Sequence, residues 1–429
     1  MTPFNRRLLY FILIYTCVEG LVINVTFPSK VGYVVKDVLI ALAGGLLLID
    51  NQGQPFGSLR RLAFPLGIFA LIQTAYLVMP GDLPLLARLV GLKMRLLYVL
   101  MMLLGYRLVR SAADVYTLMA VLILAAVPVS VFGIYLYFSG PSALQAIGGS
   151  YSAVIYATTG AWRVPGTFNS PGQFGLYLTF NSVLAIGLLL LPGLSFRMRV
   201  FLWSSLALMT LATLASGSRS PMVLTVAAAG MVMLGLGRLG RIVSVGVGAY
   251  VVLAIGFATL GAGVEERVGS IVSGEHIERL NRTYFGQLFL PKMMETPMGL
   301  GLGTATIGAR HFTEFGEVLL IESYFGIIAV ETGVLGLVAI LVLSAAAVVF
   351  LLKARLIMRN APSGPMWYAL ASFSMIVLLL GPVSTPLDSA PGNVYFWLSI
   401  GIVAKLYDLE RQSRAARLPG ADEAAVQPV

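Results

Sequence analysis

Two arginines stand beside turns of small and polar residues, a pattern suited to holding an anion. Arg163 lies in Trp-Arg-Val-Pro-Gly-Thr-Phe-Asn-Ser-Pro (162–171), and Arg219 lies in Ser-Gly-Ser-Arg-Ser-Pro (216–221). A planar guanidinium matches phosphate oxygens, and free backbone N–H groups at a helix start add further donors. The alternative is that each arginine reaches lipid headgroups or pairs with a loop carboxylate. For the two arginines together, we favour phosphate binding.

Glu322 is a candidate general base. It stands in Ile-Glu-Ser-Tyr-Phe-Gly (321–326), an otherwise apolar stretch just ahead of an apolar run. A nearby arginine would keep its carboxylate ionised, as proton abstraction requires. The alternative is a structural ion pair that pins a loop to the helices. His311 is the second candidate base, and Glu331 is expected to cap or orient the following helix.

The sequence has no pattern that predicts a metal site or a cofactor. His276 and His311 have no metal-binding spacing, and no Asp-x-Asp pair is available for Mg²⁺. The single Cys17 excludes a disulfide framework and a cysteine-based metal site. Gly299-Leu-Gly-Leu-Gly303 resembles a phosphate loop but follows no predicted strand, so we interpret it as a flexible hinge.

The elements that must position these residues are membrane helices. Of the 429 residues, 58% are hydrophobic and 11% are charged, against about 25% charged residues in soluble domains. The apolar runs are continuous rather than alternating, which indicates helices. The first run lacks a cleavage site and is interpreted as a retained helix rather than a signal peptide. The predicted spans are 8–26, 34–49, 62–79, 95–109, 115–138, 172–192, 198–215, 221–236, 242–261, 333–352, 366–382 and 392–407.

The positive-inside rule orients these spans with both termini in the cytoplasm. Most of the 29 Lys and Arg then fall on the cytoplasmic side. They are Arg6, Arg7, Arg60, Arg61, Arg107, Arg110, Arg197, Arg199, Arg238, Arg241, Lys353, Arg355, Arg359, Lys405, Arg411, Arg414 and Arg417. The net charge of +10 is therefore a topology signal and implies no nucleic-acid partner. We predict one polytopic domain over 1–409, with a disordered cytoplasmic tail over 410–429.

Three long segments fall on the outer side, at about 80–94, 139–171 and 262–332. The first carries Arg88 and Lys93, which we include as candidate substrate-binding residues. A transporter should carry ionisable residues at mid-membrane depth, in broken helices. Glu19 is almost the only charge well inside a predicted span. A chemically quiet interior and a charged outer face favour an enzyme that acts at the outer interface on an amphiphilic substrate.

Several motifs together resemble the O-antigen ligase and O-antigen or exopolysaccharide polymerase superfamily. They are Arg163-x-x-Gly-x-Phe-x-x-Pro, Ser-Gly-Ser-Arg219, Pro297-Met-Gly-Leu-Gly-Leu-Gly, Glu322-Ser-Tyr-Phe and Glu331-Thr-Gly-Val-Leu-Gly. Their order and the long outer loop between the ninth and tenth spans also match that superfamily. The resemblance covers about 160–340, and the remainder of the chain is similar only in hydropathy.

The resemblance implies a C-type glycosyltransferase fold of about 12 transmembrane helices, with a periplasmic loop over 262–332. It also implies a metal-independent activity in the bacterial inner membrane, with undecaprenyl-pyrophosphate-linked glycan as the donor. Arg219 matches the family's arginine after the small-residue turn, and Arg163 matches its arginine ahead of the sixth span. A chain-length regulator or a flippase is a candidate partner.

One departure separates two activities within the superfamily. Ligases usually carry His-Asn where this chain has Glu322-Ser323. This difference favours a polysaccharide polymerase, whose acceptor is another lipid-linked repeat unit, over a ligase that attaches glycan to lipid A-core. A polysaccharide transporter or flippase is the alternative from another class.

Overall fold

The computed structural model describes residues 2–26, 34–50, 55–79, 83–146, 162–237, 290–313 and 318–417. Within these ranges the chain is helical and contains no β-strand. Among the described residues, six helical stretches are long and apolar enough to cross a membrane. The chain is therefore an all-α membrane protein.

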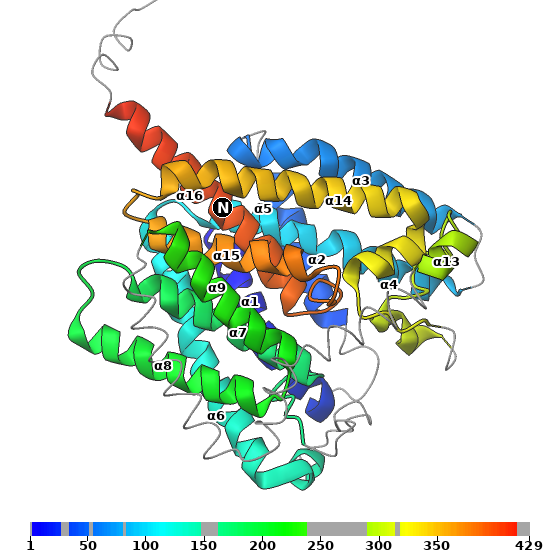
Figure 1. Ribbon diagram of the computed structural model, residues 1–429, viewed down its shortest axis with the longest axis horizontal. Coiled ribbons are helices and arrows are strands. Elements are labelled where there is room, and N and C mark those ends of the chain that lie inside the picture. Colours follow the sequence, from blue (N-terminus) through cyan, green and yellow to red (C-terminus); the bar gives the residue numbers. More distant parts are fainter. Residues whose placement is uncertain are drawn as a thin grey trace, which may run out of the picture.

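The described elements are α-helices and short 3₁₀ helices, labelled in Figure 1 where there is room. They are α1 (Pro3–Thr26), α2 (Val35–Asp50), η2 (Gly57–Leu59), α3 (Arg60–Val78), α4 (Leu85–Leu96), η3 (Leu97–Val99), α5 (Leu100–Leu108), α6 (Ala112–Ala146), α7 (Pro171–Leu189), α8 (Phe196–Ala215), α9 (Arg219–Gly235), α13 (Leu290–Glu295), η6 (Ile307–Phe312), α14 (Tyr324–Met358), α15 (Gly364–Leu380) and α16 (Gly392–Ala416). Helices overlap every predicted span except 242–261, which lies outside the described residues together with 262–289 of the long loop.

Several helices extend beyond their predicted bounds, among them α6, which continues to Ala146, into the expected outer segment 139–171. The apolar stretch containing α4 begins at Leu85 and continues to Leu108, so most of the expected outer segment 80–94 is helical. Helix α14 begins at Tyr324, within the expected loop 262–332, and α16 continues to Ala416, into the expected disordered tail. Leu, Glu, Gln, Arg and Ala all favour a helix, and hydropathy detects only the apolar part of such a helix.

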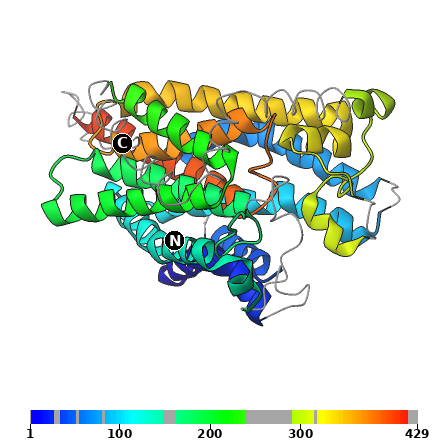
Figure 2. The same ribbon diagram turned by 60° about the horizontal axis from the view of Figure 1, so that its bottom comes forward.

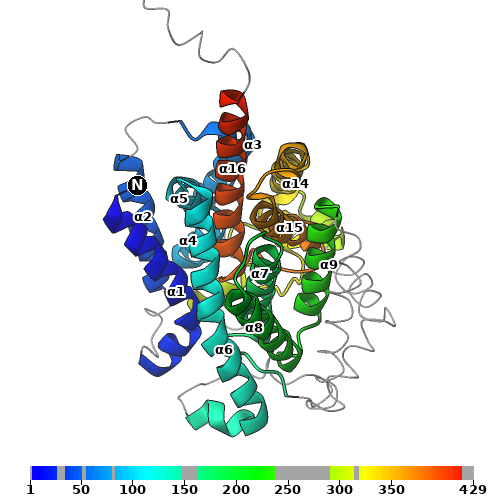
Figure 3. The ribbon, with the colours of Figure 1, turned by 90° about the vertical axis from the view of Figure 1, so that its left-hand side faces the viewer.

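Helices α5 and α16 pack together in the interior of the bundle (Figure 3). A Cβ on Gly105 would lie 2.6 Å from the Leu398 carbonyl oxygen, and one on Gly401 would lie 2.0 Å from the Met102 carbonyl oxygen. Glycine at both positions therefore lets the two backbones approach, as is common between membrane helices.

Helices α9 and α15 run antiparallel, which fixes where the candidate site lies. Gly235, at the end of α9, packs against the ring of Tyr368, near the start of α15. Because α9 rises about 24 Å over its length, its first residue, Arg219, lies level with the end of α15. We call this the Gly381 end of the bundle. Residues 290–313 lie far from the end of α16 in Figure 2.

Candidate functional site

The two candidate phosphate-binding arginines lie on adjoining segments. The arginine segment (162–170) runs along the turn between α8 and α9, where the Val164 N–H donates to the Ala215 carbonyl at 3.4 Å. Arg163 donates to the Ser218 hydroxyl at 2.9 Å. Arg219 directly follows Ser218 and is the first residue of α9. Both arginine side chains are partly buried.

The turn that carries Arg219 is built by its small residues. Gly217 has a φ of +59°, which favours glycine because it has no Cβ. The Ser216 hydroxyl donates to the Thr213 carbonyl at 2.7 Å and accepts the Ser218 N–H at 3.2 Å. The turn therefore reverses the chain within a few residues and starts α9 directly at Arg219.

A threonine clamps the arginine segment to α1 on its other side. The Thr167 hydroxyl donates to the Cys17 carbonyl, and the Thr167 carbonyl accepts the Leu21 N–H at 3.0 Å. In an uninterrupted helix, the Leu21 N–H would donate to the Cys17 carbonyl four residues earlier. Thr167 contacts both of these groups, so it inserts between two backbone partners of α1. Gly20 permits this contact, because a Cβ there would lie 2.7 Å from Phe168.

The electrostatics at the start of α9 favour an anion. A helix N-terminus carries partial positive charge and disfavours a cation, yet Arg219 stands at the first position and Arg163 contacts its N-cap, Ser218. Among the described residues, Arg219 makes no ion pair, and its Nε is buried without a hydrogen-bond partner. A phosphate group would supply the missing negative charge.

Glu322 lies at the same end of the bundle as Arg219. It is exposed and directly precedes Ser323, whose hydroxyl caps α14 by accepting the Gly326 N–H at 2.9 Å. The Ser323 hydroxyl also donates to the Gly381 carbonyl at 3.4 Å, at the end of α15. Within the described part of the chain, Glu322 has no hydrogen bond or ion pair of its own. Its carboxylate is therefore available to a substrate.

The other three candidate residues have different positions. His311 lies in η6, and its side chain is outside the described part of the structure. Arg88 donates to the carbonyls of Tyr76 and Leu77 at the end of α3, as cations do at helix C-termini. Lys93 forms an ion pair with Asp37 of α2 at 2.7 Å. The contacts of Arg88 and Lys93 thus join helices, and their substrate-binding role remains a prediction.

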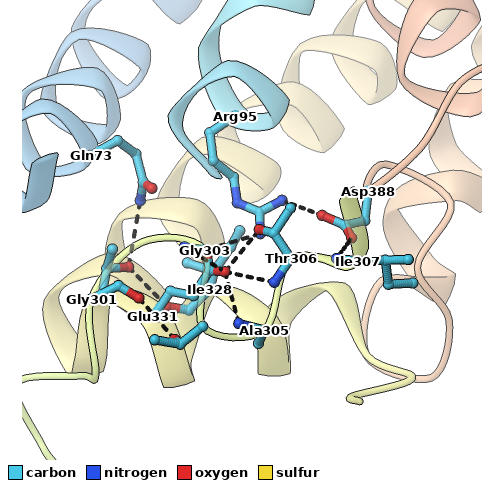
Figure 4. Close-up of polar contacts among 12 residues, drawn as sticks. Gln73, Arg95, Gly301, Gly303, Ala305, Thr306, Ile307, Ile328, Glu331 and Asp388 are labelled. Carbon is cyan, nitrogen blue, oxygen red and sulfur yellow. Dashed lines mark hydrogen bonds and ion pairs between the residues drawn. The ribbon is translucent and has the colours of Figure 1, made fainter. Parts of the chain in front are cut away.

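The sequence analysis missed a group of charges buried in the bundle. Arg95 donates to Asp388 at 2.8 Å and to Glu331 at 3.2 Å, and the three side chains are 0–2% exposed (Figure 4). We call these residues the Arg95 triad. Burial raises the pKa of Asp388, and Arg95 acts in the opposite direction. These charges are buried within the protein, on the side that the positive-inside rule assigns to the outer face, so the expectation of a chemically quiet membrane interior stays a prediction.

The glycine-rich loop binds a carboxylate of the protein itself. In the Gly loop (297–307), Glu331 Oε1 accepts the N–H groups of Gly303, Ala305 and Thr306 at 3.1, 3.1 and 2.8 Å. Positive φ angles at the loop's glycines turn these donors toward one point, as in a phosphate loop. Because the loop is bonded to α14, it does not fit the expected flexible hinge.

The loop also compensates for a break in α14. The helix has non-helical angles at Thr332 and Gly333. The Leu300 N–H donates to the Val330 carbonyl at 2.8 Å, and the Val334 N–H donates to the Pro297 carbonyl at 3.0 Å. Glu331 stands directly before the break, and its carboxylate bonds the same loop 25–28 residues upstream; that it caps or orients its helix stays a prediction.

A second group of buried charges joins α1, α2 and α4. Lys36 pairs with Glu19 at 2.7 Å and lies 5.7 Å from the centre of the Tyr98 ring. The Tyr98 hydroxyl donates to Asp37 at 2.7 Å, and Asp37 also accepts from Lys93. These pairings satisfy the charges within the bundle, as burial in hydrocarbon requires.

The site thus belongs to an all-α membrane protein with an arginine pair and an exposed carboxylate at one end of the bundle. Among the described residues, no group of three or more His, Cys, Asp or Glu side chains is arranged to hold a metal ion. Comparison of the chain with protein-family models and with curated proteins found no match.

Proposed function

We propose that the protein is a glycosyltransferase of the polysaccharide polymerase type. It would act at the periplasmic face of a bacterial inner membrane on oligosaccharides carried by undecaprenyl pyrophosphate. The observation that carries the proposal is the meeting of Arg163 and Arg219 at the start of α9. The motif resemblance supports the same assignment.

The chemistry requires a bound diphosphate and a base. Glu322 takes the proton of an acceptor hydroxyl, whose oxygen attacks the anomeric carbon of the donor sugar. The bond between that carbon and the diphosphate oxygen breaks, and the electron pair leaves with the lipid diphosphate. Arg163 and Arg219 stabilise the charge that develops on the departing group. Two guanidinium groups can do this in the absence of a metal ion.

An O-antigen ligase would use the same donor and the same arginine pair. It differs only in its acceptor, which is lipid A-core rather than a second lipid-linked repeat unit. Glu322-Ser323, in place of the His-Asn that ligases usually carry, favours the polymerase. A strain lacking the protein would lose long-chain polymer but still decorate lipid A if the protein is a polymerase, whereas a ligase gives the reverse pattern.

A transporter is a second candidate, because the structure has buried charges and a broken helix. Arg95, Glu331 and Asp388 are buried, and α14 is interrupted at Thr332. However, Glu331 Oε1 alone accepts four hydrogen-bond donors. A carboxylate held by so many donors is a poor site for reversible proton or ion binding. This saturation favours a structural role for the triad and the enzyme as the function.

The test compares the candidate-site residues with an arginine at the start of α8. We expect Arg163→Ala, Arg219→Ala and Glu322→Gln to abolish long-chain polysaccharide, with normal amounts of protein in the membrane. The matched control is Arg197→Ala, an exposed arginine in the first turn of α8. Lipid-linked single repeat units should accumulate in the inactive strains. Normal polymer in both arginine variants would exclude the phosphate role, and flipping of a labelled lipid-linked glycan independent of Arg219 would select the transporter.

A further inference from the structure

The Glu322 turn (318–323) is fixed on both of its sides. On one side, the Leu319 N–H donates to the Thr304 carbonyl of the Gly loop at 2.7 Å. On the other side, the Tyr324 N–H donates to the Ser384 carbonyl at 3.0 Å, in the connection between α15 and α16. Glu322 is exposed between these two attachments and has no bond of its own within the described residues. Its position therefore depends on the segments that hold the turn, these two among them.

Both of these segments lead back to Arg95. On the Gly loop, the Thr306 hydroxyl accepts from Arg95 at 3.2 Å and donates to Glu331 at 2.8 Å. In the other connection, Asp388 accepts from Arg95 at 2.8 Å. The Tyr324 ring, at the end of the turn, lies 5.1 Å from the Arg95 guanidinium. Arg95 thus contacts the Gly loop, the α15–α16 connection and the first residue of α14, while Arg310 of η6 and Gly381 hold the turn through separate bonds to Val318 and Ser323.

A guanidinium is suited to this arrangement because its donors form a planar fork in a fixed geometry. Arg95 uses Nη1 for Asp388 and Nη2 for Glu331 and Thr306 (Figure 4). All of these contacts are buried, where an unpaired charge or donor is costly. The fork therefore holds the Gly loop and the α15–α16 connection in one relative position.

We propose that Arg95 is the positioning residue of Glu322, acting through the Thr306 hydroxyl and Asp388. The catalytic consequence rests on the proposed function, because it takes Glu322 as the base. The placement of the turn itself is independent of that function and is measured separately.

The experiment removes one hydroxyl without changing side-chain shape. Thr306→Val deletes the hydroxyl through which Arg95 directly contacts the Gly loop, and Thr306→Ser retains it. Thr304→Val is the matched control, because its hydroxyl donates to the Gly301 carbonyl of the same loop. Arg95→Lys, which keeps the charge but loses the fork, replaces Thr306→Val if that variant does not fold.

Placement is measured with a spin label. Because Cys17 is the single cysteine of the chain, Cys17→Ala provides a background in which Glu322→Cys is labelled in full-length protein in nanodiscs. We expect Thr306→Val to increase the mobility of the label, and Thr306→Ser and Thr304→Val to leave it unchanged. An unchanged label in Thr306→Val would overturn the proposal whatever the function of the protein.

Turnover is measured with the native Glu322 and a purified undecaprenyl-pyrophosphate oligosaccharide. We expect Thr306→Val to lower kcat by about 10- to 100-fold, with KM unchanged and with recovery in Thr306→Ser. A merely structural role would lower the amount of folded enzyme but not kcat per folded molecule. A mobile label with normal kcat would overturn the positioning role, whereas activity in Glu322→Gln and Arg219→Ala would reject the proposed function itself.

Discussion

Two substitutions of Glu331 test whether the hydrogen bonds between its carboxylate and the Gly loop stabilise the fold. One removes the acceptor oxygen, and the other retains it. Glu331→Ala leaves the N–H groups of Gly303, Ala305 and Thr306 without their acceptor. An unsatisfied buried donor costs about 1–3 kcal/mol, so the three together cost roughly 3–9 kcal/mol. The total stability of a typical domain is only about 5–15 kcal/mol. We therefore expect Glu331→Ala to prevent accumulation of folded protein.

Glu331→Gln should be tolerated much better. All three N–H groups donate to Oε1, which the amide can retain as its carbonyl oxygen. The loss falls on Oε2, which accepts from Arg95 at 3.2 Å, and a hydrogen bond to a charged group contributes about 1.5–3 kcal/mol. Asp388 still balances the charge of Arg95. The glutamine variant should fold and melt at a lower temperature than the native protein.

The assay is the fraction of monodisperse protein that survives heating in detergent, followed by size-exclusion chromatography. Glu322→Ala serves as the control, because that side chain is exposed and makes no bond among the described residues; its effect should stay within about 0.5 kcal/mol. Equal losses in Glu331→Ala and Glu331→Gln would contradict the reasoning, since they would show that the three N–H groups do not depend on Oε1.

Two pairs of glycines give further predictions. Gly91→Ala places a Cβ 2.7 Å from the Gly303 nitrogen and should destabilise the folded protein by about 1–3 kcal/mol. Gly67→Ala, whose Cβ meets no atom within 4 Å, should stabilise the folded protein by up to about 1 kcal/mol. Shifts of the same sign in the melting temperatures of the two variants would contradict both predictions. Gly20→Ala places a Cβ 2.7 Å from the Thr167 carbonyl oxygen and should displace the arginine segment, so that polymer length falls at normal protein level. Gly45→Ala, which meets no atom within 4 Å, should leave the polymer unchanged in the same gel assay.

The helices could be predicted from the sequence because hydropathy is a local property. Lipid leaves the backbone no alternative partners, so a continuous apolar run becomes a helix. The same property explains the errors at α4 and α14. Arg95 and Glu331 interrupt their apolar runs and suggested boundaries there, yet both lie within the helical bundle. A charge that is paired inside the protein can therefore lie within the bundle rather than at its boundary.

The partners of those charges could not be predicted from spacing. Arg95 meets Glu331 and Asp388 across 236 and 293 residues of sequence, and no local pattern specifies such pairs. One available signal was overlooked. The topology assigned all three residues to the same outer side, where an arginine at the membrane edge needs carboxylates at the same depth.

The arginine site was more predictable, because its signal was local. The turn Ser-Gly-Ser before Arg219 indicates a helix start, and the structure places that start directly at Arg219. The approach of Arg163 could not be derived from either segment alone. It depends on Thr167, which bonds into α1, and on Gly20, which gives it room.

These contacts suggest why charges are buried in a membrane protein at a cost in desolvation. Glu19 lies on α1 between the two residues bonded by Thr167, and it pairs with Lys36. Lys36 lies over Tyr98, one turn beyond Arg95. The ion pair and the ring contact thus join the stretch of α1 that Thr167 bonds to the segment that carries Arg95. In hydrocarbon, no water replaces a broken contact of this kind, so we expect these contacts to help hold the two parts of the candidate site at a fixed separation, which the proposed transfer between two bound substrates requires.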